Sequence, residues 1–210
     1  CWCPYVVAQG RRFRACSAES VVDELAHLVK HYAPPRIVLR DPDLSKAISG
    51  GKALREVVGQ ASTAAIPGLY WYAINMGRWG TMEGLATIMQ HKDDIQASMQ
   101  FICDNEPSYY FGGCHRYFGA YWTKLPFGKD PQKSLRHFDR SIEIAPKYLA
   151  NKVVKARYYA TLAGKRKLYG RLLREVLEAP ADALAEAQPE NAFAQKQARR
   201  LLEQTDRRFD

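Results

Sequence analysis

The chain has 210 residues and a mass of 23.8 kDa, and 47% of its residues are hydrophobic and 25% are charged. These proportions are typical of a globular protein and exclude a disordered or collagen-like chain. Thirty-one Lys and Arg against 22 Asp and Glu give a net charge of 31 − 22 = +9. Residues 146–210 hold 14 basic and 8 acidic residues, mixed at helical spacing. We therefore interpret most of the surplus as a solvated helix face and predict no nucleic-acid binding.

No stretch of the sequence approaches the roughly 20 apolar residues that a membrane-spanning helix needs. The first residues also lack the basic and apolar pattern of a signal peptide. We expect no transmembrane span and no signal peptide within the printed sequence.

The N-terminal segment predicts one short α/β unit. Apolar residues at helical spacing predict a helix over 20–32, and the run RIVLR predicts a strand over 36–40. The opening CWCPYVVAQGRRFR, followed by this helix and strand, resembles the start of a cobalamin-binding radical SAM enzyme. In that family three cysteines spaced C-x3-C-x2-C hold an iron–sulfur cluster, whereas here Cys3 matches the last ligand and Cys1 stands only two residues before it. We interpret residues 1–45 as a radical-SAM-like fragment that is not an independent domain. Cys1 and Cys3 would hold a metal only if missing sequence completed the cluster.

The five cysteines are odd in number and unevenly spaced, which argues against a disulfide framework. We expect Cys103 and Cys114 to be small buried hydrophobic side chains.

From residue 46 onward the pattern predicts an all-α domain. Apolar segments with a period near 3.6 are separated by Gly and Pro, and no further strand pattern occurs. The predicted helices cover residues 52–62, 67–78, 82–90, 92–104, 108–124, 131–145, 148–162, 166–179 and 190–207.

The helices repeat at a nearly constant distance. Pro146 and Pro180 end similar units, and 180 − 146 = 34 is the length of a tetratricopeptide repeat. Pro107 ends an earlier unit at 146 − 107 = 39 residues, because the turn before residue 131 is longer. We predict tetratricopeptide-like helical hairpins stacked in an α-α superhelix over residues 46–210.

Four long motifs within residues 46–210 carry a more specific resemblance. They are GLYWYAINMGRW (68–79), PSYYFGGCHRYFGAY (107–121), LLREVLEAP (172–180) and PENAFAQKQARRLL (189–202). Together they resemble the TRAP transporter T component (TatT) family. The resemblance implies a periplasmic lipoprotein of tetratricopeptide-like hairpins that forms a homotrimer, pairs with the transporter's substrate-binding protein and binds a hydrophobic small ligand in a pore. The family's N-terminal portion, with its lipoprotein signal and first hairpins, has no counterpart in the motifs.

The segment 109–122 is the richest in candidate binding residues. Its aromatic residues form two adjoining stripes on a helix, which indicates either core packing or a groove for a ligand or partner. Residues 70–79 would supply a facing wall. The candidate binding residues are Tyr70, Trp71, Tyr72, Asn75, Trp79, Tyr110, Phe111, His115, Arg116, Tyr117 and Tyr121. Asn75 is either a hydrogen-bonded core residue or an orienting contact, and Arg116 either binds an acidic group or forms a surface ion pair.

No arrangement of residues predicts catalysis or a cofactor. No Ser or Cys nucleophile has a base at recognisable spacing, and the five histidines are scattered, with only His27 and His31 on one helix face. Cys114 and His115 are adjacent, which directs them about 100° apart on a helix, so we expect no shared metal site. We predict a non-enzymatic binding module without a catalytic, metal or cofactor site. The alternative is an iron–sulfur enzyme fragment built on the N-terminal segment.

Overall fold

The computed structural model describes residues 42–125 and 127–209. The predicted helix over 20–32, the strand over 36–40 and the radical-SAM-like segment up to residue 41 lie outside this part of the chain. Every regular element in the described part is helical, and no strand occurs in it, which confirms the all-α prediction.

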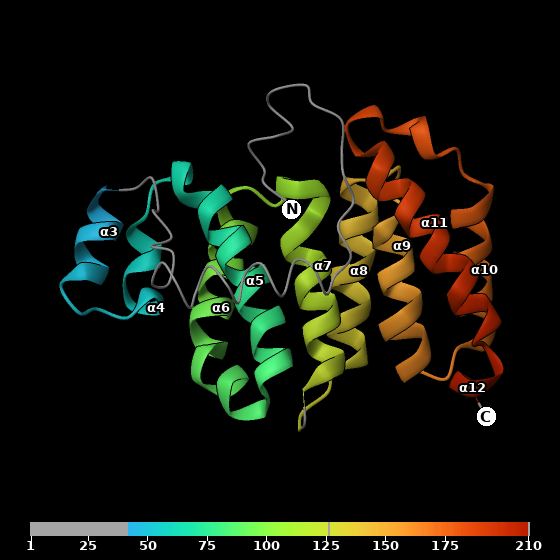
Figure 1. The fold of residues 1–210 in the computed structure, drawn as a ribbon, viewed down its shortest axis with the longest axis horizontal. Coiled ribbons are helices and arrows are strands. Elements are labelled where there is room, and N and C mark those ends of the chain that lie inside the picture. The colour runs from blue at the N-terminus through green and yellow to red at the C-terminus, as the bar shows by residue number, and fades with distance from the viewer. Residues whose placement is uncertain (1–41, 126, 210) are drawn as a thin grey trace, which may run out of the picture. The chain divides into compact units, whose positions relative to one another are not determined.

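Figure 1 shows the helices in chain order, from α3 to α12. Their bounds are α3 Pro42–Ser49, α4 Leu54–Val57, α5 Ile66–Glu83, α6 Leu85–Asn105, α7 Tyr109–Lys124, α8 Pro131–Ile144, α9 Ala150–Lys155, α10 Arg166–Glu178, α11 Gln188–Glu203 and α12 Asp206–Phe209. A single π-helical stretch, Ala156–Ala160, continues α9. The long helices pack in pairs, α5 along α6, α7 along α8 and α10 along α11.

The predicted helix boundaries between residues 78 and 92 are wrong, because α5 continues to Glu83 and α6 begins at Leu85. The break expected between residues 90 and 92 does not occur, because α6 runs unbroken from Leu85 to Asn105. The polar residues there are the solvent side of a helix, and the chain instead turns at Gly84, whose φ of 115° favours glycine. Helix α3 is not among the predicted helices, and it begins at Pro42, because proline is well suited to the first turn of a helix.

The three prolines of the predicted repeat occupy equivalent positions. Pro107 follows the last residue of α6 by 107 − 105 = 2, Pro146 follows that of α8 by 146 − 144 = 2, and Pro180 follows that of α10 by 180 − 178 = 2. Because proline cannot continue a helix, it fixes where each of these helices stops. The tetratricopeptide-like geometry of the hairpins stays a prediction.

Two buried clusters form the core. The first cluster contains residues of helices α3, α4, α5, α6 and α7, and its Ile66, Leu69 and Met99 are fully buried. The second joins α9, α10 and α11 and includes Tyr169 and Leu173. Burying one such aliphatic side chain contributes roughly 1.5–3 kcal/mol.

Helices α7 and α8 pack closely at Gly119. A Cβ atom on this residue would lie 2.7 Å from the ring of Phe138, which is fully buried. The Ser134 hydroxyl donates to the Gly119 carbonyl oxygen at 2.8 Å. The absence of a side chain at Gly119 therefore permits the close packing of α7 against α8.

The expectation for two cysteines is wrong. Cys103 of α6 and Cys114 of α7 form a disulfide, with their Cα atoms 5.6 Å apart. Cys114 is buried as expected, but Cys103 is half-buried. The sequence separation of 11 residues did not reveal the pairing, because the pairing depends on how α6 and α7 pack after the turn between them.

We predict that Gly119→Ala lowers the free energy of unfolding by about 1–3 kcal/mol, because the added methyl group overpacks the contact with Phe138. The matched control is Gly77→Ala in α5, where a Cβ atom meets nothing within 4 Å. That variant should be neutral or up to about 1 kcal/mol more stable, because alanine favours a helix over glycine. Urea unfolding of both variants measures the difference, and equal stabilities would contradict the packing described for α7 and α8.

Candidate functional site

The start of α7 is a left-handed turn. Tyr110, Phe111 and Gly112 have φ values of 45°, 59° and 73°, so regular helix begins only after them. Gly112 suits this conformation, and a Cβ atom there would also lie 3.1 Å from the Ser141 Cα atom. The two aromatic residues are strained, since a residue with a side chain held in this region costs about 1–3 kcal/mol. The two stripes expected from Tyr110 and Phe111 onward are therefore broken at their first residues.

The guanidinium of Arg116 stabilises this turn. Its Nη1 donates to the Phe111 carbonyl at 3.2 Å and to Asn151 Oδ1 at 2.7 Å. Its Nη2 donates to the Tyr110 carbonyl at 3.3 Å and to the Tyr70 hydroxyl at 3.0 Å. One side chain thus joins α5, α7 and α9.

Asn151, which is fully buried, completes the network. Its Nδ2 donates to the Phe111 carbonyl at 3.1 Å and to the Ser141 carbonyl at 2.8 Å. The freed carbonyls of the turn are therefore hydrogen-bonded, as buried backbone groups require.

The guanidinium lies over two aromatic rings, Tyr110 and Tyr148, which contact further rings. We name the set the aromatic cluster, and its members are Tyr70, Trp71, Tyr109, Tyr110, Phe111 and Tyr148. The Tyr110 ring lies 5.2 Å from Tyr70 and 5.1 Å from Trp71, and Phe111 stacks on Tyr148 at 4.5 Å. Arg116 lies over the Tyr148 ring at 5.0 Å, which is cation–π geometry.

The charge of Arg116 has only neutral partners in the described part of the chain. It forms no ion pair with any carboxylate of residues 42–125 or 127–209, so the expected alternative of a surface ion pair is not found there. Burial raises the pKa of the Tyr110 and Tyr148 hydroxyls, so both stay protonated at neutral pH. The site is a half-buried cation among rings and neutral hydrogen-bonding groups, and the charge of Glu190 also acts on the Tyr110 and Tyr148 hydroxyls.

The structure brings together five of the predicted site residues and separates the others. Those that meet are Tyr70, Trp71, Tyr110, Phe111 and Arg116. Asn75 is exposed, so it is not the hydrogen-bonded core residue that was one of its two interpretations. Trp79 is 44% exposed, with its ring 5.7 Å from His91.

The remaining tyrosines lie in other surroundings. Burial, followed by the charge of Asp94, raises the pKa of Tyr72 to about 12. Tyr117 and Tyr121 stack on each other at 6.0 Å, one turn apart on α7, and burial raises the pKa of Tyr117.

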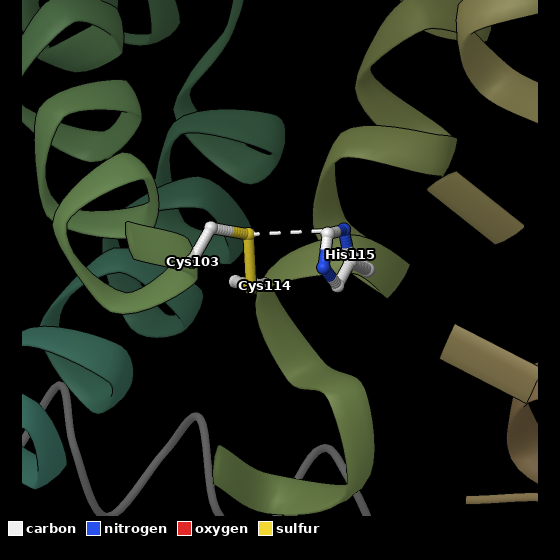
Figure 2. A group of neighbouring side chains, drawn as sticks. All are labelled: Cys103, Cys114 and His115. Carbon is white, nitrogen blue, oxygen red and sulfur yellow. Dashed lines mark hydrogen bonds between the residues drawn. A yellow bond between two sulfur atoms is a disulfide. The ribbon is translucent and has the colours of Figure 1, made fainter. Parts of the chain in front are cut away.

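A second group of side chains lies on another side of α7. Figure 2 shows His115 beside the disulfide of Cys103 and Cys114, with its Nδ1 3.9 Å from the Cys103 sulfur. One ligand atom from each of these three residues falls within 4.8 Å of the others. The expectation that Cys114 and His115 share no metal site stays a prediction, although both residues lie close to Cys103. Although adjacent helical residues diverge by about 100°, Cys103 of α6 lies between the two directions.

His137 of α8 extends this group. Its Nδ1 lies 3.1 Å from the Nδ1 of His115. Burial lowers the pKa of both imidazoles, and that of His137 falls to about 4. Both rings are therefore neutral at neutral pH, and one of the two nitrogens carries the proton between them.

Three residues of these sites were not predicted. Asn151 and Tyr148 gave no sequence signal, because a single polar or aromatic residue in an amphipathic segment has many uses. His137 was counted among scattered histidines, and only the packing of α7 against α8 pairs it with His115.

The sequence matches the family described as TRAP transporter T-component over residues 26–209. The chain belongs to this family, as the motifs of residues 68–202 indicated. The match also covers residues 26–45, which we had placed in the radical-SAM-like fragment. No curated protein matches the sequence significantly.

None of the helices described here is long and apolar enough to cross a membrane.

We predict that Arg116→Met destabilises the fold by at least about 1–3 kcal/mol, because it leaves Asn151 Oδ1 and two turn carbonyls short of donors. The control, Arg140→Met, removes only an exposed pair with Glu143 and should change stability by less than about 1 kcal/mol. Thermal and urea unfolding measure both. Equal losses would show that Arg116 does not stabilise the turn.

Proposed function

We propose that this T component acts as a non-enzymatic binding module that holds an apolar small molecule carrying a carboxylate and also contacts the transporter's substrate-binding protein. The observation that carries the ligand half is the guanidinium of Arg116, which has no carboxylate partner among the described residues and lies over two rings of the aromatic cluster. Family membership supports the transport role.

The chemistry of the cluster suits such a ligand. Tyrosine and tryptophan rings bury apolar surface while their polar ends remain available for hydrogen bonds. A carboxylate is a stronger acceptor for a guanidinium than a neutral oxygen. The Tyr70 hydroxyl is the most replaceable partner of Arg116, because the two carbonyls and Asn151 are fixed by the turn.

The surface of α5 offers a contact for the partner protein. Trp79 and Met82 are three residues apart, on one helix face, and are 44% and 65% exposed. Large apolar side chains at the surface are typical of protein interfaces, and tryptophan is frequent among the residues that dominate binding energy.

Three further expectations accompany this proposal. The family resemblance implies periplasmic action, a homotrimer and a hydrophobic pore.

The iron–sulfur alternative depends on Cys1 and Cys3, which lie outside the described residues, and we do not carry it forward.

The first test compares decanoate with decanol, which share an apolar chain and differ in charge. We expect decanoate to bind at least about tenfold more tightly, because hydrogen bonds to a charged group contribute about 1.5–3 kcal/mol. Isothermal titration calorimetry measures both affinities on the whole chain. Equal affinities would show that Arg116 does not contact the carboxylate of the ligand. If neither probe binds, the aromatic cluster is not a site for such ligands.

The second test uses the substrate-binding protein of a TRAP transporter. We expect a Trp79→Ser, Met82→Ser double variant to weaken its binding at least about tenfold, because removing central apolar contacts costs more than 1 kcal/mol each. Phe193→Ser on α11 is the control, since Phe193 is a similarly exposed apolar residue, at 60%. Surface plasmon resonance compares the three proteins. A similar loss in both variants would place the interface elsewhere.

A further inference from the structure

We propose that Cys103, Cys114 and His115, with His137 as the fourth ligand, form a binding site for Zn²⁺ that opens when the disulfide is reduced. This site is separate from the aromatic cluster, and the inference does not rest on the proposed function.

The three ligand atoms are already close enough to share an ion. The Cys103 sulfur lies 3.9 Å from His115 Nδ1, and the two sulfurs and the imidazole fall within 4.8 Å of one another. Two ligands on one tetrahedral zinc ion lie about 3.5–4 Å apart, since Zn–S is about 2.3 Å and Zn–N about 2.0–2.1 Å. Small rotations about the cysteine side chains would place both sulfurs at such distances.

The histidine of α8 would have to move closer to the sulfurs to serve as the fourth ligand, because it lies outside the group of three whose ligand atoms are within 4.8 Å of one another. His137 Nδ1 lies 3.1 Å from His115 Nδ1, close to the roughly 3.3 Å between two imidazole nitrogens on one zinc ion. Helices α6, α7 and α8 would each supply ligands, so the ion would link three helices.

The ligand types select the metal. Two thiolates and two imidazoles suit zinc and other soft or borderline ions, whereas magnesium and calcium prefer oxygen ligands. The surrounding arginines, Arg136 and Arg140, repel a lone cation. Two thiolates offset this repulsion, because their charge of −2 neutralises that of Zn²⁺.

Access to the site is one-sided. Cys114 is fully buried, but Cys103 and His115 are only half-buried, so a reductant can reach the disulfide at the Cys103 sulfur. While the disulfide is intact the sulfurs carry no charge, and the site has little affinity for a cation.

The chemistry balances as a thiol–disulfide exchange followed by ligand exchange. A dithiol transfers two electrons and two protons to the Cys103–Cys114 bond, which becomes two thiols while the dithiol becomes a disulfide. Zn²⁺ then displaces the two thiol protons, which pass to solvent. Exchange with a small-molecule disulfide, which is reduced to two thiols, takes two electrons from the thiolates, closes the Cys103–Cys114 bond and releases the ion.

The test titrates Co²⁺, a coloured substitute for Zn²⁺, into the whole chain carrying Cys1→Ser, Cys3→Ser and Cys16→Ser. Cys103 and Cys114 are then its only sulfhydryl groups. The protein is used oxidised, and again after reduction by a phosphine that is then removed under nitrogen. We expect a thiolate-to-cobalt charge-transfer band of one-to-one stoichiometry in the reduced form, bleached by Zn²⁺, and none in the oxidised form. No band after reduction, or the same band in both forms, would overturn the proposal.

Two variants assign the ligands. Cys103→Ser should abolish the band, and His115→Gln should weaken Co²⁺ binding at least about tenfold, while His91→Gln on α6 should leave it unchanged. In the protein that keeps Cys103, Cys114 and His115, Zn²⁺ should also raise the melting temperature of the reduced form and not that of the oxidised form. This measurement needs none of the ligand variants, so it remains valid if one of them fails to fold. An unaltered spectrum in His115→Gln, or an equal melting shift in both redox forms, would contradict the site.

Discussion

The left-handed turn of Tyr110, Phe111 and Gly112 is the constraint on which the described sites depend. Two of its residues hold a backbone conformation that is costly for any residue with a side chain. The turn is stabilised because Arg116 and Asn151 donate hydrogen bonds to the Tyr110 and Phe111 carbonyls, which are not bonded within the helix. It directs the rings of Tyr110 and Phe111 toward Tyr70 and Tyr148, rather than along the face of α7. Without it, α7 would begin as an ordinary helix and the aromatic cluster would not form.

Arg116 consequently has a structural role and is also the charge of the candidate binding site. Its hydrogen bonds reach Asn151 and Tyr70, which are 35 and 46 residues away in the sequence. A ligand that contacts the guanidinium therefore acts on the junction of α5, α7 and α9. Ligand binding and the stability of this junction are linked, because a ligand that binds only the folded form stabilises it.

Three consecutive residues of α7 meet three different neighbours. Cys114 is bonded to Cys103 of α6, His115 contacts His137 of α8, and Arg116 reaches α5 and α9. The rotation of about 100° per residue explains this distribution. A helix surrounded by others can present a different chemical group to each, and here a redox-sensitive pair, an imidazole pair and a guanidinium adjoin one another. The sequence indicated that adjacent side chains of this helix diverge, but not which neighbour each of them meets.

The sequence by itself determined the all-α class, most helix bounds and the family. The predicted helices over 131–145 and 166–179 end one residue beyond α8 and α10, because apolar periodicity and proline act within a single helix. Only the tertiary structure decided the Cys103–Cys114 bond, the pairing of His115 with His137 and the network of Arg116 with Asn151. These contacts join residues 11 to 46 positions apart, and their geometry follows from how separate helices pack. A periodic pattern shows which face of a helix is buried, but it does not show which side chain of another helix lies opposite.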